Sequence, residues 1–249
     1  MKKTLLCLAL LSASSSAFSA DFIQWTDTSL TALYGHNYKL ASSDEQTTIT
    51  FESAGGWKYG DWFWFEDFIR NDGASVDSKT NYGEFSPRLS AGKIFGTNLS
   101  VGPITDLSAA FTYEHGEGDV ESYLYGLGID LKVPYFTYFQ LNTYRRDAKN
   151  NNSSGWQLTP TWRMDIPVGS SNIVIDGYLD WVFASDHDRG YETNFHFNPQ
   201  IKYDLGQLIA GEKFKNHLMV GIEYDYWANK YGVDSVDQDT YSVIVKYHF

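Results

Sequence analysis

Residues 155–166 read GWQLTPTWRMDI, a stretch in which apolar and polar side chains alternate without a break. One face carries Trp156, Leu158, Pro160, Trp162, Met164 and Ile166, and the other carries Gly155, Gln157, Thr159, Thr161, Arg163 and Asp165. A period of two indicates a β-strand with two different faces. Strands of soluble proteins show the same alternation but are mostly about 5–6 residues long, whereas a tilted strand that crosses a membrane needs about 10. The stretch therefore predicts a transmembrane strand with one face on lipid and one on a polar lumen.

The same alternation recurs along the chain, for example at 191–203 and 218–226. Counting such segments predicts about 12 strands, with boundaries good to about two to four residues. They lie near 26–37, 46–56, 61–70, 81–93, 104–115, 120–131, 135–146, 155–166, 172–183, 191–204, 216–228 and 239–249. Several longer polar connections alternate with shorter ones, as in outer-membrane proteins. The expected fold is all-β, a transmembrane antiparallel up-and-down β-barrel.

The C-terminal segment 241–249 reads YSVIVKYHF and stops on an apolar aromatic residue, Phe249. Chain ends are usually polar and frayed unless something holds them. An even number of strands lets the last strand pair antiparallel with the first, which would hold this end. Tyr241–Phe249 also looks like the C-terminal signal by which the barrel assembly machinery recognises its clients.

The N-terminus has the three parts of a signal peptide. Lys2 and Lys3 form a basic start, residues 5–11 form an apolar run, and small residues follow. Cleavage is expected after Ser19 or, as a second choice, after Ala20, so that residues 20–249 form the barrel domain. The single cysteine, Cys7, lies inside this segment. The mature chain would then contain no disulfide and would reside outside the cytoplasm.

Composition excludes several classes of function. The formal net charge of −12 disfavours nucleic acid as a partner. The sequence after residue 19 has no apolar run of about 20 residues that could form a spanning helix. The six histidines show no zinc-ligand spacing, and the motifs of serine hydrolases, P-loop proteins and zinc proteases do not occur. We therefore expect no enzyme activity, no metal and no cofactor.

Four stretches in the first two thirds of the chain resemble a known family. They are TFESAGGWKYGDWFWFED (50–67), GEFSPRLSAGKIFG (83–96), LSVGPITDLSAAFTYE (99–114) and YGLGIDLKVPYFTYFQLNTYRR (125–146). In this order they resemble the Tsx-type nucleoside-specific channel-forming outer-membrane proteins, particularly the Vibrio-type OmpK branch. The resemblance implies a monomeric barrel in the outer membrane of a Gram-negative bacterium, surrounded by lipid and lipopolysaccharide. It also implies passage of nucleosides and deoxynucleosides, and use of the outer loops as receptors by phages or colicins.

The expected inward faces supply a candidate solute site. In GDWFWFED (60–67) both faces are aromatic, and an inward Asp67 would place Phe63 and Phe65 in the lumen, either to stack on a base or merely to fill space. Aromatic faces suit a nucleobase and carboxylates suit ribose hydroxyls. The predicted substrate-binding residues are Phe63, Phe65, Asp67, Glu84, Arg88, Tyr144, Arg146, Asp180, Glu192, Asp225 and Trp227.

Two other functions compete with a nucleoside channel. A barrel hydrolase could use Asp180, Glu192 and His196 near the outer rim to activate water. An adhesin or phage-receptor barrel could have the same fold with no selective transport. Conductance that nucleosides block would favour the channel, and peptide cleavage without conductance would favour the hydrolase.

Overall fold

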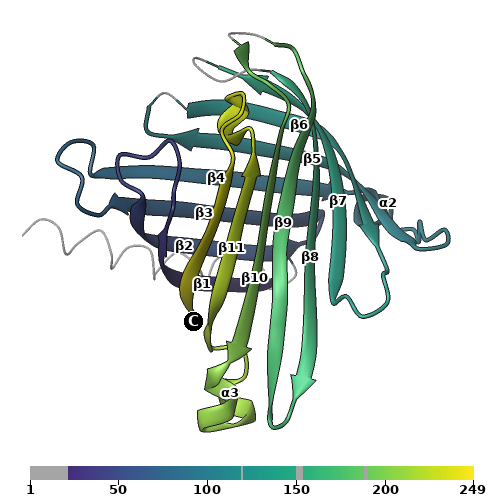
Figure 1. Ribbon diagram of the computed structural model, residues 1–249. Helices are drawn as coiled ribbons and strands as arrows, with labels where there is room; N and C mark the ends of the chain where they lie inside the picture. The colour runs from purple at the N-terminus through teal and green to yellow at the C-terminus, as the bar shows by residue number, and fades with distance from the viewer. Residues whose placement is uncertain (1–21, 119, 150–153, 188–189) are drawn as a thin grey trace, which may run out of the picture.

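The computed structural model describes residues 22–118, 120–149, 154–187 and 190–249 (Figure 1). The predicted signal peptide, residues 1–19, lies outside these ranges. Within them, 12 antiparallel strands form a closed barrel in which neighbours in sequence pair and β12 pairs with β1. The strands are β1 (Ile23–His36), β2 (Glu45–Trp57), β3 (Gly60–Asn71), β4 (Lys79–Ser90), β5 (Ile104–Gly116), β6 (Val120–Leu131), β7 (Tyr138–Ala148), β8 (Gly155–Val168), β9 (Ser171–Ser185), β10 (Asn194–Asp204), β11 (Leu218–Ala228) and β12 (Gln238–His248). The predicted fold class is confirmed.

Four strand ends lie three residues from their predicted positions, within the expected margin; the first is β1, which begins at Ile23 instead of residue 26. β4 ends at Ser90 instead of residue 93, because the Ser90 side chain accepts a hydrogen bond from Lys93 N (3.0 Å) and caps the short helix α2 (Ala91–Phe95). β7 begins at Tyr138 instead of residue 135, since Tyr135 adopts a left-handed φ of 71°. β10 begins at Asn194 instead of residue 191.

The barrel seam holds the C-terminus. Leu30 of β1 is paired with Tyr247 of β12, and Phe249 N donates to Thr28 O at 3.0 Å. The last strand is therefore paired on both sides and has no free edge.

Long ion pairs identify the inner face of the barrel. Lys246 of β12 reaches across β1 to Glu52 of β2 at 2.6 Å, and Arg88 of β4 reaches across β5 to Asp130 of β6 at 2.5 Å. Side chains can bridge an intervening strand in this way only on the concave side. The faces predicted to be polar and inward are therefore inward. Exposed apolar residues such as Leu127 and Val243 occupy the opposite face.

The two ends of the barrel differ. One end carries both ends of the barrel chain, tight hairpins, and the helices α2, α3 (Leu205–Ala210) and η2 (Glu212–Phe214). The helices lie in the two longest connections, 91–103 and 205–217, and the other end carries loops that form no α-helix within the described ranges, including the 229–237 connection with η3 (Lys230–Gly232). Tight hairpins face the periplasm in outer-membrane barrels, so the end that carries the 58–59 and 169–170 hairpins is periplasmic and the opposite end is the outer mouth. In Figure 1 the near strands β8–β12 run across the far strands β2–β4, as strand tilt in a closed barrel requires. No helix in the described residues is both long and apolar enough to span a membrane.

Candidate functional site in the barrel lumen

Most basic side chains of the inner face are buried behind their acidic partners. The side chains of Lys202 and Lys246 are 2% and 8% exposed, whereas their partners Asp176 and Glu52 are 19% and 25% exposed. Arg88 follows the same rule, buried between Asp61 and Asp130. Because the cations lie against the wall, carboxylates form much of the charged surface that a solute would meet.

Two of the predicted site residues are structural ions of the wall. Arg146 forms a two-fold ion pair with Glu114 and also donates to Ser122 Oγ (3.1 Å) and Gln157 Oε1 (3.2 Å). Arg146 and Glu114 are both buried, and Arg88 is buried to the same degree. A buried pair of this kind fixes the geometry of neighbouring strands and leaves its guanidinium closed to a solute.

Two predicted aromatic contacts have little free ring surface. Tyr144 is only 3% exposed and packs with Ala110 and Leu124 in a small inner core. Trp227 is stacked on the His196 imidazole, with ring centroids 3.8 Å apart and planes 14° from parallel. Tyr144 therefore offers no face for a nucleobase, and Trp227 has one face already covered.

The open aromatic surface lies on β3 and β4. Phe63 is 38% exposed, its ring centroid lies 5.8 Å from that of Phe65, and Phe65 lies 5.9 Å from Tyr82. We call these three rings the aromatic strip. Tyr82 was missed by the sequence prediction, although it stands two residues before Glu84 and therefore shares its inward face.

Beside the aromatic strip are carboxylates whose hydrogen-bond partners are neutral. Asp67 accepts from Thr50 Oγ1 at 2.5 Å, and Glu84 accepts from Tyr82 Oη at 2.6 Å. On the opposite wall Asp180 accepts from Thr159 Oγ1 at 2.6 Å. Asp180 also accepts from Gln157 Nε2 at 2.9 Å, so its hydrogen-bond partners are neutral as well.

The remaining predicted residues lie nearer the outer mouth. Asp225 is paired with His196 at 2.8 Å and accepts from Gln238 Nε2 at 2.7 Å. Glu192 precedes β10, with one carboxylate oxygen 3.6 Å from His187 Nδ1. Glu223, two residues before Asp225 on β11 and therefore on the same face, accepts from Gln200 Nε2 at 2.8 Å.

Comparison with known proteins agrees with this geometry. The sequence model of the family described as "Nucleoside-specific channel-forming protein, Tsx" matches residues 20–249. The chain belongs to the Tsx family. A relative, "Outer membrane protein OmpK" of Vibrio parahaemolyticus, is 26% identical over 202 residues, which cover 74% of this chain and 77% of the relative.

Solved structures similar to this Tsx-family barrel include "KdgM porin". The two share 13% identity with a TM-score of 0.51, over 89% of this chain and 99% of the porin, so the likeness concerns the fold alone. The family makes this barrel an outer-membrane channel, and the predicted location in the outer membrane is confirmed.

His196, the histidine of the hydrolase alternative, is held among wall side chains in the Tsx-family barrel. His196 Nε2 is paired with Asp225, and its Nδ1 lies 3.5 Å from Tyr178 Oη, while Trp227 covers the ring. Both imidazole nitrogens are thus engaged in wall contacts. Across the described part of the chain, no three His, Cys, Asp or Glu side chains gather as ligands for a metal ion.

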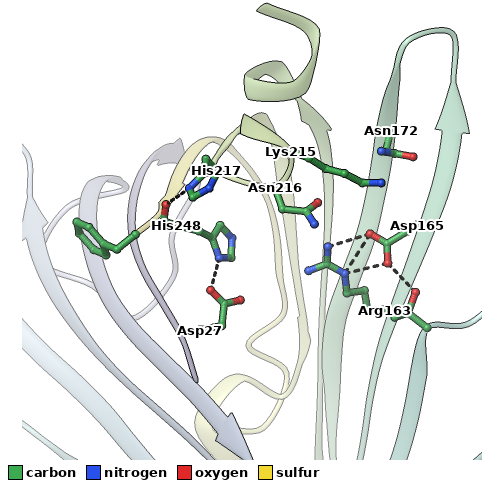
Figure 2. Close-up of a pocket in the computed structure, with 10 residues that line it drawn as sticks. Asp27, Arg163, Asp165, Asn172, Lys215, Asn216, His217 and His248 are labelled. Atoms are coloured by element: carbon green, nitrogen blue, oxygen red, sulfur yellow. Dashed lines mark hydrogen bonds and ion pairs between the residues drawn. The ribbon is translucent and has the colours of Figure 1, made fainter. Parts of the chain in front are cut away.

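The periplasmic end of the Tsx-family barrel contains a cavity of about 540 Å³ beside the C-terminus (Figure 2). Its charged groups are joined in pairs: Arg163 to Asp165 at 2.8 Å, and His248 to Asp27 at 2.8 Å. Lys215 and Asn216, from the connection that follows α3, point into the same space.

Proposed function

We propose that this barrel carries nucleosides and deoxynucleosides across the outer membrane by passive diffusion. The observation that supports the proposal best is the aromatic strip of Phe63, Phe65 and Tyr82, with Asp67 and Glu84 beside it on the same two strands. An apolar ring surface next to hydrogen-bond acceptors matches the two halves of a nucleoside.

Each half of the solute would use a different part of the site. The base would stack on the aromatic strip, a contact worth about 1–3 kcal/mol per base. The ribose hydroxyls would donate to carboxylate oxygens of Asp67 and Glu84, or of Asp180 on the facing wall. Such contacts are weak enough for release on the far side, which diffusion through a channel requires.

The predicted residues divide into two groups on this proposal. The solute-facing group is Phe63, Phe65, Asp67, Glu84 and Asp180, with Glu192, Asp225 and Trp227 nearer the outer mouth. Arg88, Tyr144 and Arg146 shape the wall, because burial keeps them from a solute.

The arrangement of charge supports a preference for uncharged solutes over nucleotides. Carboxylates border the lumen while most of its cations are buried behind them. A phosphate group would meet this surface with like charge and lose hydration in a narrow passage. Neutral nucleosides avoid that cost.

Planar bilayers containing the purified barrel test the proposal. Adenosine should reduce the ionic current in a concentration-dependent way, and adenosine monophosphate should reduce it less. A conducting channel whose current no nucleoside reduces would contradict the proposal and indicate a general pore. Cleavage of peptides without conductance would favour the hydrolase alternative.

We also propose that the barrel assembly machinery recognises Tyr241–Phe249 before the seam closes. The side chains of Tyr241, Val243 and Phe249 lie exposed on the outer surface of the finished barrel, so they are accessible on the strand that pairs last. Phe249→Asp should strongly reduce the amount of heat-modifiable barrel in the membrane. Wild-type amounts of folded Phe249→Asp protein would contradict this role.

A further inference from the structure

Two loops on either side of the barrel seam fold over the outer mouth. In the β1–β2 loop, Asn37 Nδ2 donates to Asp239 O at 2.8 Å and Lys39 N donates to Gln238 Oε1 at 2.8 Å. The Tyr38 hydroxyl of this loop lies 2.7 Å from Ser242 Oγ on the inner face of β12. The loop is thus bound to the first residues of β12 and places Tyr38 inside the mouth.

The β11–β12 loop is fixed from the other side. Asn229 Nδ2 donates to Thr193 O at 3.0 Å, and Lys230 N donates to Val236 O at 2.6 Å. Tyr231 has a left-handed backbone, with φ at 55° and ψ at 26°, which the loop imposes on a residue that disfavours it. Its side chain is 56% exposed and meets the Trp227 ring edge-on, with centroids 5.1 Å apart.

Lys230 lies at the centre of the two loops. The residue is 4% exposed, and its Nζ donates to Gln238 Oε1 at 2.5 Å. The same Nζ lies 4.9 Å from the ring centroid of Tyr231 and 5.9 Å from those of Trp227 and Tyr38. These distances are within the range of cation–π attraction. One ammonium group therefore contacts rings from both loops and from β11.

We propose that Lys230 is a positioning residue of the channel: its buried ammonium group holds Tyr38, Trp227 and Tyr231 as a rigid aromatic constriction at the outer mouth. The exposed ring of Tyr231 is then the first stacking surface that a solute entering from outside meets. This inference rests on the proposed channel function, and it adds a specificity-determining residue that no feature of the strand pattern indicated.

The environment of Lys230 makes its charge adjustable. Burial lowers the pKa of the Lys230 ammonium to about 8, although the nearby carboxylate of Asp225 opposes that shift. Further titratable groups lie on the elements around the constriction. They are His196 on β10, Glu192 before β10 (its N donates to Gly232 O), Asp67 on β3, Asp237 before β12, and the Tyr38 and Tyr231 phenols. Raising the pH above about 8 removes the positive charge and with it the cation–π attraction.

Lys230→Met tests the inference because it keeps the length of the side chain and removes the charge. We expect higher single-channel conductance than in the wild type, and adenosine block weaker by about 2- to 30-fold, from the usual strength of a cation–π contact. Lys39→Met is the matched control, since Lys39 lies on the neighbouring loop and its exposed ammonium contacts only the Asn37 side chain among the described residues. Heat-modifiable mobility confirms that both variants are folded.

The pH dependence of the conductance distinguishes a charged Lys230 that positions the rings from a Lys230 side chain that only fills space. In the wild type, raising the pH from 7 to 10 should reproduce the conductance increase of Lys230→Met. Lys230→Arg, which stays charged across this range, should keep the wild-type conductance of pH 7 throughout. The pH comparison of the wild type with Lys230→Arg needs only ionic current. It therefore still tests the role of Lys230 if Lys230→Met does not fold or if nucleosides do not block the channel.

The outcomes separate the two proposals. Conductance that depends on Lys230 and pH, with no nucleoside block, would support the constriction and contradict nucleoside transport. Wild-type conductance in Lys230→Met, or an identical pH response in Lys230→Arg and the wild type, would overturn the role of Lys230 while leaving the lumen site standing.

Discussion

On the wall formed by β5–β7, Tyr144 and Arg146 lie buried beneath neighbouring side chains, whereas on β3 and β4 the inward residues Phe65 and Glu84 are only half-buried. Both walls carry an aromatic residue and ionisable residues on their inner faces. The β5–β7 wall forms a packed core, in which Ala110 is fully buried, whereas the β3–β4 wall keeps exposed aromatic surface at Phe63.

Small residues explain the difference. On β6, a Cβ added to Gly128 would lie 2.5 Å from Asn142 Oδ1 and 3.0 Å from an Arg88 nitrogen, so only glycine lets these side chains lie flat on the strand. Long side chains of β4 and β7 fold onto this bare patch and become buried. The role of an inward residue therefore depends on the size of its neighbours across the strands, in addition to its own chemistry.

The largest effect should come from breaking the buried pair of the packed wall. Arg146→Met leaves the Glu114 carboxylate buried without a counter-charge, which should lower the free energy of unfolding by about 3–5 kcal/mol. Urea unfolding of the barrel in lipid vesicles measures this change. The double variant Arg146→Met, Glu114→Gln should recover much of the loss. Equal instability of the single and double variants would show that the ion pair is not the cause.

Tyr144→Ala should act on the same wall through packing. Removing a buried aromatic ring from contact with Ala110 and Leu124 should cost about 3–5 kcal/mol of unfolding free energy. Folded Tyr144→Ala channels should retain adenosine block, since the ring has no free face. A weaker block at unchanged stability would instead place Tyr144 on the solute path and remove the distinction between the two walls.

Much of the barrel could be predicted from period-two patterning. The alternation at 155–166 predicts a strand, and the structure has β8 there. The faces predicted to point inward are the ones that carry the ion pairs across intervening strands. Two-residue periodicity works well here because each strand has lipid on one side and polar groups on the other. Strand ends were less predictable, since the cap of α2 depends on Ser90 and on Asp106 from a different strand.

The candidate site could be predicted only as a list of inward residues. The alternation predicts that Tyr144 and Trp227 point inward, but it does not predict which neighbouring side chains cover their rings. The stacking of His196 on Trp227 depends on register between β10 and β11, and the burial of Tyr144 depends on Ala110 two strands away. Lys230 lies in a loop with no period, so neither its burial nor its aromatic neighbours had a sequence signal.

Phe65→Ala tests whether the β3–β4 wall binds the solute, in contrast to the packed β5–β7 wall. Loss of one stacking surface should weaken adenosine block about 5- to 100-fold, corresponding to about 1–3 kcal/mol, while unfolding changes less than in Tyr144→Ala. Current block in planar bilayers, measured alongside urea unfolding, gives both numbers. Trp162→Ala is the control, since Trp162 lies on the lipid face and stacks with Phe197 at a centroid distance of 5.8 Å. A block unchanged in Phe65→Ala would remove the aromatic strip from the proposed site.

Asp67→Asn should have the smallest effect, although Asp67 lies beside the aromatic strip. The amide oxygen can still accept the Thr50 hydroxyl, which the carboxylate accepts at 2.5 Å, and can still accept from a ribose hydroxyl. Only the extra strength of a charged acceptor is lost, so adenosine block should weaken by less than about 5-fold. Asp67→Ala, which removes the acceptor altogether, should weaken it more. Equal block in the wild type and in both variants would show that the ribose is bound elsewhere, with Asp180 on the facing wall as the next residue to change.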